Sequence, residues 1–119
     1  MATCSSQKDE VIGHAQIIET DELGVFEIKS LAVIERRQRE GVGHRLIEAA
    51  ASYCRHRGAR RLIVATAAAD IDNLRFYQRQ GFRMKCIVRD AFGPSNGYAK
   101  GLVVDGIALR DQVVFDRDL

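Results

Sequence analysis

The sequence is poor in several residue types, and each shortage excludes a class of protein. Its 119 residues contain no Trp, one Pro and 7% aromatic residues. A single Pro with ten Gly excludes a collagen-like chain or a Pro-rich linker. No apolar run approaches the roughly 20 residues that span a bilayer, and no basic stretch with an apolar core opens the chain. We therefore expect no membrane partner and no secretory signal.

Charge of either sign is also not in large excess. The sequence has 18 Lys and Arg against 16 Asp and Glu, a formal net charge of +2. This small net charge, together with 46% hydrophobic residues, argues against a disordered chain. The length fits one domain of ordinary size. We expect residues 1–119 to form a single domain.

Cysteine is scarce and odd in number. Cys4, Cys54 and Cys86 are widely spaced, whereas a disulfide framework or a zinc knuckle needs closer or paired cysteines. We expect reduced thiols in a cytoplasmic protein, with Cys54 and Cys86 in the core. No metal site is predicted.

Basic residues gather in two places that could contact nucleic acid. The two groups are Arg36, Arg37 and Arg39, and Arg55, Arg57, Arg60 and Arg61. Glu35, Glu40 and Glu48 interleave with them, and no aromatic residue stands in the first group. A solvated face or a small polyanionic ligand therefore explains them better than nucleic acid.

Hydrophobic periodicity predicts two helices among several strands. The expected strands are Val11–Glu19 (as the second arm of a hairpin), Val25–Val33, Leu62–Thr66, Phe82–Val88 and Ile107–Phe115. The expected helices run from Gly43 to a stop at Gly58, and from a cap at Asp70 or Asp72 to Gly81. The segment Gly93–Gly97 is expected to be a loop. Along the first helix, one face is expected to carry Val42, Leu46, Ala49 or Ala50, Tyr53 and Cys54.

The order of these elements predicts the fold class. Because Leu62–Thr66 is continuously apolar, we expect it to be buried on both faces. It is separated from Val25–Val33 by one helix, so the two strands should be parallel with a right-handed crossover. Phe82–Val88 and Ile107–Phe115 should be antiparallel neighbours. The prediction is a mixed α+β fold with a central parallel pair in an otherwise antiparallel sheet.

The segment Gln38–Gly43, set between a predicted strand and a predicted helix, is the most informative part of the sequence. Glycines allow close approach of the backbone, and N–H groups at a helix N-terminus can bind phosphate oxygens. The residues after Gly43 do not fit a Walker loop, and Leu46 stands where a dinucleotide fingerprint needs glycine. The segment is therefore expected to bind an anion such as a phosphate, and the alternative is an ordinary flexible turn.

Two motifs resemble those of GNAT superfamily N-acetyltransferases, which share the acyl-CoA N-acyltransferase fold. Gln38-x-x-Gly41-x-Gly43 is similar to the motif that binds the pyrophosphate of acyl-CoA in this family. Leu31–Val33 matches the strand end that pairs with the pantetheine arm. Leu74–Phe82 resembles the family's second signature, a helix that ends in Phe-Tyr-x-x-x-Gly-Phe. The resemblance extends from about Val11 to the C-terminus.

The resemblance implies acetyl-CoA as the co-substrate and assigns residues to it. The loop that would hold the pyrophosphate contains Gln38, Arg39, Gly41, Val42, Gly43 and His44. The backbone of Leu31, Ala32 and Val33 would bind pantetheine, and the Val33 N–H would polarise the thioester carbonyl. Asn73 is assigned as a further contact, because the family's usual asparagine position is occupied by Asp70.

Two residues match the family's catalytic positions. Glu27 matches a glutamate that serves as the base for the acceptor amine, although a solvent-facing strand residue would look the same. Tyr77 matches the tyrosine that protonates the departing thiolate, and its alternative role is an aromatic residue of the core. Glu22, Glu27, Asp90 and Asp105 could attract a cationic acceptor, and 91–101 is expected to border its site.

The resemblance implies direct acetyl transfer from acetyl-CoA to a primary amine of a small molecule or peptide. The alternative is a non-catalytic acyl-CoA-binding module on the same fold. Family members usually begin with a strand and helices that wall the acceptor site, and we expect these to be missing here. Either a homodimer completes the cleft, or the chain is part of a longer protein.

Overall fold

The computed structural model describes residues 2–5, 11–33 and 41–119, with the backbone alone for 2–5, 11–13, 30, 32 and 33. The chain divides into two compact units, Met1–Ile63 with Asp118–Leu119, and Val64–Arg117. Strand β4 (Arg61–Ala67) and strand β8 (Gln112–Asp118) each contribute residues to both units. The single domain over 1–119 stays a prediction.

The first unit is a sheet with one helix. Its strands are β1 (Ala2–Ser5), β2 (Val11–Glu19), β3 (Val25–Val33) and the start of β4, and the sheet follows this order. β1 pairs antiparallel with β2, and β2 pairs antiparallel with β3. The predicted position of Val11–Glu19 as the second arm of a hairpin is therefore confirmed.

The predicted parallel pair is formed by β3 and β4. The carbonyl oxygen of Gly24, just before β3, accepts hydrogen bonds from the N–H groups of Arg60 at 2.7 Å and Arg61 at 3.2 Å, where β4 begins. The two neighbouring strands thus start at the same edge of the sheet, with α1 (Val42–His56) between them in the chain. This is the βαβ arrangement that makes consecutive strands parallel.

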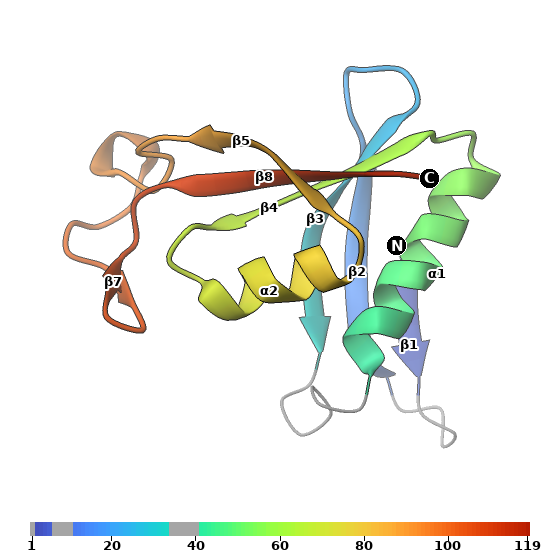
Figure 1. Ribbon diagram of the computed structural model, residues 1–119, viewed down its shortest axis with the longest axis horizontal. Helices are drawn as coiled ribbons and strands as arrows, with labels where there is room; N and C mark the ends of the chain where they lie inside the picture. The colour runs from blue at the N-terminus through green and yellow to red at the C-terminus, as the bar shows by residue number, and fades with distance from the viewer. Residues whose placement is uncertain (1, 6–10, 34–40) are drawn as a thin grey trace. The chain divides into compact units, whose positions relative to one another are not determined.

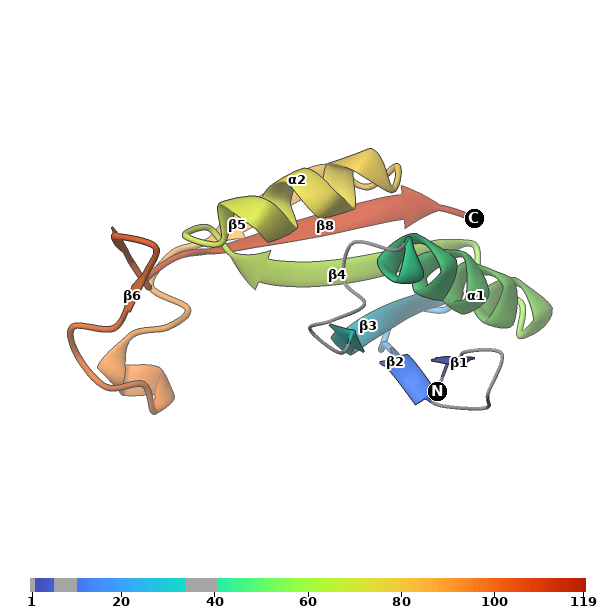
Figure 2. The same ribbon diagram turned by 90° about the horizontal axis from the view of Figure 1, so that it is seen from below.

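Helix α1 packs against the sheet of the first unit, as Figures 1 and 2 show. Its fully buried side chains are Val42, Leu46, Ile47, Ala50, Ala51 and Cys54. The predicted alternative Ala49 or Ala50 resolves to Ala50, and the predicted Tyr53 is only half-buried. Ile47 and Ala51 also belong to the buried face, although they were not predicted. Strand β3 contributes Phe26 and Ile28 to the core, and both are buried.

The second unit contains the end of β4 and most of β8, with α2 (Ile71–Arg79) and β5 (Arg83–Val88). The sheet order is β4-β8-β5, and β5 pairs antiparallel with β8 as predicted. Between β5 and β8 lie a short 3-10 helix η2 (Pro94–Asn96) and a small hairpin of β6 (Val103–Val104) and β7 (Ile107–Ala108). The predicted loop Gly93–Gly97 therefore contains a turn of helix.

The predicted strand Ile107–Phe115 is wrong, because the structure divides it into β7 and β8. Around the break, the backbone bonds to residues of the preceding loop. The N–H of Phe92 donates to the Arg110 carbonyl at 3.0 Å, and the Asp111 carboxylate accepts from the Asp90 N–H at 2.9 Å. An Asp90–Arg110 ion pair of 2.7 Å closes the same loop. These contacts hold 109–111 outside both strands.

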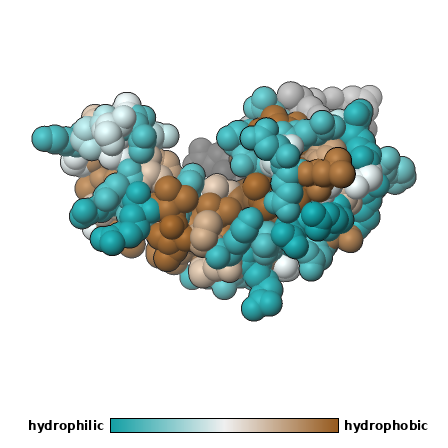
Figure 3. Space-filling model, turned by 90° about the horizontal axis from the view of Figure 1, so that it is seen from above, coloured by the Kyte–Doolittle hydropathy of each residue, from teal (hydrophilic) through white to brown (hydrophobic). Residues whose placement is uncertain are grey.

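Two predictions of burial are also wrong. Cys86 is exposed because β5 is the edge strand of the sheet, and all six of its residues are exposed. In β4, only Leu62 and Val64 are buried and the intervening residues are half-buried, so the strand is not covered equally on both faces. Apolar side chains open to solvent are visible as brown surface in Figure 3.

These elements confirm the predicted mixed α+β class, with a mostly antiparallel sheet and one parallel pair. Within the described ranges, neither helix nor any other helical segment is long and apolar enough to span a membrane.

Candidate active site

The N-terminus of α1 has the geometry of an anion site. Gly41 is the N-cap residue with φ 74°, a left-handed conformation that disfavours residues with a Cβ. The first backbone bond of the helix runs from the N–H of Arg45 to the carbonyl of Gly41 at 3.1 Å. The N–H groups of Val42 and Gly43 precede this bond, so the helix supplies them with no acceptor.

No competing negative charge lies in the described first turn of α1. The first turn of α1 contains no acidic residue, and Gly41 receives no side-chain cap. A Cβ placed on Gly41 would meet no heavy atom within 4 Å, so the glycine is required by its backbone angle rather than by lack of space. The turn can therefore present N–H groups and the positive end of the helix dipole to phosphate oxygens. Among the assigned loop residues, Gln38 and Arg39 lie outside the described residues.

Strand β3 carries the candidate base and the predicted pantetheine contacts. The Glu27 carboxylate is 21% exposed and forms a 3.1 Å ion pair with Lys29 Nζ, two residues along the strand. Leu31 is half-buried, and Ala32 and Val33 pair with β2 opposite His14 and Gly13. The carboxyl end of β3 and the N-terminus of α1 lie at the same end of the first unit (Figure 1). The structure thus brings these two predicted parts of the cofactor site together.

Helix α2 is fixed at its start by Asp70, which settles the choice of cap between Asp70 and Asp72. The Asp70 carboxylate accepts a hydrogen bond from the N–H of Asn73 at 3.0 Å, as in a typical N-cap. The Asn73 side-chain amide donates to Thr66 Oγ1 at 3.2 Å and so connects the helix to the end of β4. Asn73 retains its amide oxygen as an acceptor for a ligand.

Tyr77 is the only buried residue of α2. Its ring lies 5.2 Å from Phe76, 5.7 Å from Phe82 and 5.8 Å from Phe115, measured between centroids. Burial, and to a smaller extent the negative charge of Asp70, raises the pKa of the Tyr77 phenol to about 12. Among the described residues, no group forms a hydrogen bond with its hydroxyl. The phenol therefore stays protonated at neutral pH and keeps its O–H available to a ligand.

The Gly-Phe end of the second motif has a structural role. Gly81 adopts φ 88°, and its N–H donates to the Gln78 carbonyl at 3.1 Å while the N–H of Phe82 donates to the Tyr77 carbonyl at 3.0 Å. This pair of bonds is the Schellman ending of a helix. It returns Phe82 to the core, where its ring packs edge-on against Tyr77. The motif thus fixes the position of Tyr77.

Sequence reasoning missed two interactions around these residues. The first is the effect of Asp70 on Tyr77, which a spacing of seven residues, about two helical turns, could have indicated. The second is the Glu27–Lys29 pair, since residues two apart in a strand share a face.

Three arginines of the second basic group, which consists of Arg55, Arg57, Arg60 and Arg61, interact with nearby side chains. The guanidinium of Arg57 lies 4.7 Å over the Tyr53 ring. Arg60 pairs with Glu22 at 3.5 Å, and Arg61 pairs with Asp118 at 3.5 Å. The first group, Arg36, Arg37 and Arg39, lies outside the described residues. Within the described ranges, no three His, Cys, Asp or Glu side chains gather in a way that could hold a metal ion.

Comparisons with known proteins agree with this geometry. The sequence model of the Acetyltransferase (GNAT) family matches residues 3–82. The uncharacterized N-acetyltransferase YvbK of Bacillus subtilis (strain 168) is 32% identical over 111 residues, which make up 93% of this chain and 70% of YvbK.

Two solved structures of acetyltransferases share the fold with a TM-score of 0.85 and 32% identity. An IAA acetyltransferase from Bacillus cereus ATCC 14579 is matched over 96% of this chain and 74% of its own. A Bacillus subtilis acetyltransferase in complex with CoA is matched over 93% of this chain and 71% of its own. The fold and the glycine turn define an acetyltransferase of the acyl-CoA-dependent class. The chain belongs to the GNAT acetyltransferase family.

Proposed function

We propose that this protein transfers the acetyl group of acetyl-CoA directly to a primary amine of a small molecule or peptide. The observation that carries the proposal is the N-terminus of α1, where Gly41 in the left-handed conformation precedes the N–H groups of Val42 and Gly43, which have no acceptor within the helix. Such a turn suits a pyrophosphate. The CoA held by the Bacillus subtilis relative supports this ligand.

The proposal assigns cofactor contacts to residues of α1, β3 and α2. Gln38, Arg39 and Gly41–His44 hold the pyrophosphate. The backbone of Leu31, Ala32 and Val33 binds the pantetheine arm, with the N–H of Val33 on the thioester carbonyl. Asn73 adds an amide contact. No metal takes part in the proposed reaction.

The chemistry requires a neutral amine and a stabilised leaving group. The Glu27 carboxylate accepts a proton from the amine nitrogen, directly or through a water molecule, as the nitrogen attacks the acetyl carbonyl. The tetrahedral intermediate then releases amide and CoA thiolate. Tyr77 donates its O–H to the departing sulfur.

The pKa of Tyr77 defines how it acts. A thiol has a reference pKa of about 8.5, well below the value of about 12 for this phenol. Complete transfer of the Tyr77 proton to the thiolate would therefore be uphill by roughly 5 kcal/mol. The phenol stabilises the developing negative charge on sulfur through a hydrogen bond, and solvent completes the protonation of the thiolate.

Two further properties belong to the proposal. We place the protein in the cytoplasm, where acetyl-CoA is made and where free thiols such as Cys54 and Cys86 persist. We also propose a homodimer, because the edge strand β5 exposes Met84, Ile87 and Val88 to solvent. A light-scattering mass equal to one chain at micromolar concentration would contradict the dimer.

The test of the function has two stages. The melting temperature is first measured with CoA and acetyl-CoA, since ligand at 100 times its dissociation constant should add about 2.7 kcal/mol to the free energy of unfolding. Release of CoA thiol is then followed with polyamines, aminoglycosides, amino acids and peptide N-termini. Acetyl transfer to an amine supports the proposal, and the absence of any stabilisation contradicts it. Binding without turnover would instead indicate a non-catalytic acyl-CoA-binding module.

A further inference from the structure

Strands β5 and β8 are antiparallel neighbours, yet the chain takes residues 89–111 to connect them. Neighbouring antiparallel strands are usually joined by about two to five residues, so most of this connection, the long loop, is not needed to link them. None of its residues is buried, so the long loop has no core of its own. The bonds at its base therefore decide where it lies.

Hydrogen bonds between its first and last residues close the base of the long loop. The Asp111 carboxylate accepts the N–H of Asp90 at 2.9 Å, and the Asp90 carboxylate accepts a hydrogen bond from Arg110 Nε at 2.7 Å. Asp90 has a left-handed φ of 57°, which is unfavourable for a residue with a Cβ. Such a conformation persists only where the surrounding structure holds it. A carboxylate is a stronger acceptor than a neutral group, so Asp111 helps to hold Asp90.

The main chain of Asp111 bonds to a different segment of the second unit. Its carbonyl accepts the N–H of Ala68 at 2.9 Å, directly after the end of β4. The N–H of Asp70 then donates to the carbonyl of Ala67 at 3.0 Å, and Asp70 caps α2. Asp111 therefore connects the end of β5, the start of β8 and the turn from which α2 begins.

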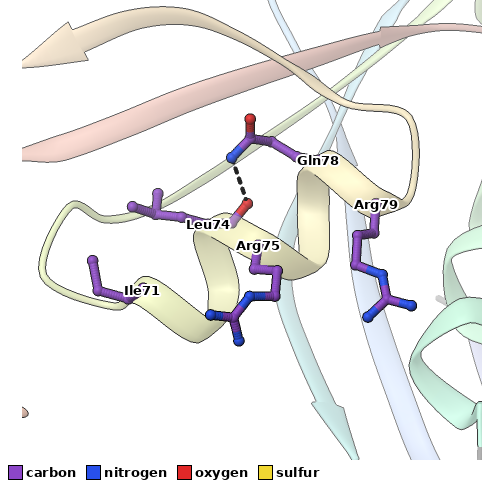
Figure 4. A pocket seen from close by; sticks show the side chains of 5 residues that line it. All are labelled: Ile71, Leu74, Arg75, Gln78 and Arg79. Atoms are coloured by element: carbon purple, nitrogen blue, oxygen red, sulfur yellow. Dashed lines mark hydrogen bonds between the residues drawn. The ribbon is translucent and has the colours of Figure 1, made fainter.

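Helix α2 has few contacts along its length that could fix its position. Tyr77 is its only buried residue. Other side chains of the helix line an open cavity, drawn in Figure 4, and they are Ile71, Leu74, Arg75, Gln78 and Arg79. The hydrogen bond drawn there joins Gln78 to Leu74 of the same helix, so it does not attach α2 to another element. The position of Tyr77 therefore depends strongly on how the two ends of α2 are held.

We propose that Asp111 is a positioning residue for the candidate active site, which holds the start of α2 and thereby the Tyr77 hydroxyl in the place that acetyl transfer requires. The proposal rests on the proposed function, because it supposes that this hydroxyl donates to the departing sulfur. Asp111 itself contacts neither substrate nor cofactor. It acts through Ala68, two residues before the cap at Asp70. A displacement of about 1 Å in such a donor can cost much of its effect on the rate.

Loss of the Asp111 carboxylate should affect both of its bonds. Asp111 precedes β8, so its backbone lies outside that strand and is directed by the bond of its side chain to Asp90. Without this bond, Asp90 can relax, and the carbonyl of Asp111 is held less firmly toward Ala68. The bond from the N–H of Phe92 to the carbonyl of Arg110 remains. The long loop should therefore loosen rather than unfold.

The experiment compares the native chain with Asp111→Ala, Asp111→Asn and a control, Asp116→Ala. Asparagine retains an acceptor oxygen for the N–H of Asp90, so it should rescue the loss. Asp116 on β8 is half-buried like Asp111, but its carboxylate forms no hydrogen bond or ion pair with the residues that the structure describes. Melting temperatures verify folding, and the dissociation constant of CoA verifies the cofactor site.

Ultraviolet titration of Tyr77 reports on α2 rather than on overall stability. It is obtained as the difference between each protein and the same protein with Tyr77→Phe. The raised pKa of Tyr77 comes from burial and from the charge of Asp70, and a displaced start of α2 weakens both. The midpoint should therefore fall by about half a pH unit in Asp111→Ala. It should stay at the native value in Asp111→Asn and in Asp116→Ala.

Hydrogen exchange follows the same contact through the amides. The N–H of Ala68 is bonded to Asp111, and the N–H of Asn73 is bonded to the Asp70 carboxylate. Both amides should exchange about tenfold faster in Asp111→Ala and at the native rate in the other two variants. If Asp111→Ala does not fold, the native chain decides: the amides of Asp90, Ala68 and Asn73 should then open with the same free energy, and unequal values would overturn the inference.

The rate of acetyl transfer completes the test, with the best acceptor from the amine panel. In Asp111→Ala, kcat should fall by about tenfold, and in Asp111→Asn it should stay within about twofold of native. An unchanged Tyr77 midpoint with unchanged exchange at Ala68, or equal losses in Asp116→Ala, would overturn the inference alone. If no protein, the native chain included, acetylates any amine, the proposed function fails, and the role of Asp111 in it fails too.

Discussion

The carboxylate of Asp70 and the phenol of Tyr77 are coupled along α2. Asp70 caps the helix by accepting the N–H of Asn73 at 3.0 Å. Burial is the larger cause of the raised pKa of Tyr77, about 12, and the negative charge of Asp70 is the second. Asp70 thus starts the helix and helps to keep the Tyr77 hydroxyl protonated, so that it can donate a hydrogen bond.

Replacement of Tyr77 tests its role directly. Tyr77→Phe should lower kcat by about 10²-fold, a typical contribution of one positioned hydrogen-bond donor to developing charge, while the dissociation constant of CoA changes less than about threefold. The phenyl ring retains the contacts with Phe76, Phe82 and Phe115. Tyr53→Phe on α1 removes a hydroxyl elsewhere and should leave kcat unchanged. An unchanged kcat in Tyr77→Phe would contradict the role of its hydroxyl as a hydrogen-bond donor to the departing sulfur.

Alkaline pH should destabilise the fold through Tyr77. Its reference pKa is 10.0, and its pKa in the folded chain is about 12. Between these values the folded chain binds more protons than the unfolded chain, so stability is complete below pH 10 and falls as pH rises toward 12. The loss reaches about 2.7 kcal/mol for two units.

Denaturant unfolding at pH 9 and 11.5 measures this loss. In Tyr77→Phe, the part of the fall in the free energy of unfolding that Tyr77 causes between these two pH values should disappear. Asp70→Asn keeps a good helix cap but removes the negative charge, so it should lower the pKa of Tyr77 in an ultraviolet titration. The titration of Tyr77 is obtained as the difference between the native chain and Tyr77→Phe. A midpoint near 10 for this difference would contradict the raised pKa of Tyr77.

The backbone angle of Gly41 provides a test of the cofactor turn. Gly41→Ala places a Cβ on a residue with φ 74°, which should cost about 1–2 kcal/mol. Gly58→Ala, at the other end of α1 with φ 82° and equally open space, should cost a similar amount of stability. Only Gly41→Ala should also raise the KM for acetyl-CoA, by about fivefold for ~1 kcal/mol of lost binding. Equal KM values in the two variants would remove the support for a phosphate site at Gly41.

The parts of the fold that local sequence determines could be predicted. α1 and its glycine turn follow from an amphipathic period and a motif, and the parallel pair follows from the single helix between β3 and β4. The division of Ile107–Phe115 could not be predicted, because it depends on Asp90 and Phe92 bonding to residues about 20 positions later. Contacts between residues so far apart in the chain leave no periodic pattern in the sequence.

The candidate site was predictable to the same extent. Motif spacing indicated Tyr77, Asn73 and the glycines, because their roles depend on positions within one helix or turn. It could not indicate the hydrogen bond from the Asn73 amide to Thr66 Oγ1, because a contact between the start of a helix and the end of a strand depends on how the two elements pack.

Glu27 is tested by a substitution that keeps its shape. Glu27→Gln removes the carboxylate that pairs with Lys29, and kcat should fall by about 10²-fold with little change in the KM for acetyl-CoA. Glu19→Gln on the neighbouring strand β2 is the control for an exposed carboxylate. If both variants transfer acetyl groups at the native rate, Glu27 is a surface residue and another group serves as the base.

The reactivity of the cysteines distinguishes direct acetyl transfer from a mechanism that passes through an acetyl-cysteine intermediate. Burial raises the pKa of the Cys54 thiol, which lowers its thiolate content and its reactivity, whereas Cys86 is exposed on β5. Iodoacetamide should label Cys86 in the folded protein and Cys54 only after unfolding, as mass spectrometry of peptides can show. Cys86→Ser should retain native kcat, because the proposed reaction passes from acetyl-CoA to the amine in one transfer. A stoichiometric acetyl-enzyme that vanishes in Cys86→Ser would instead establish a covalent route, since the only accessible described thiol would then carry the group.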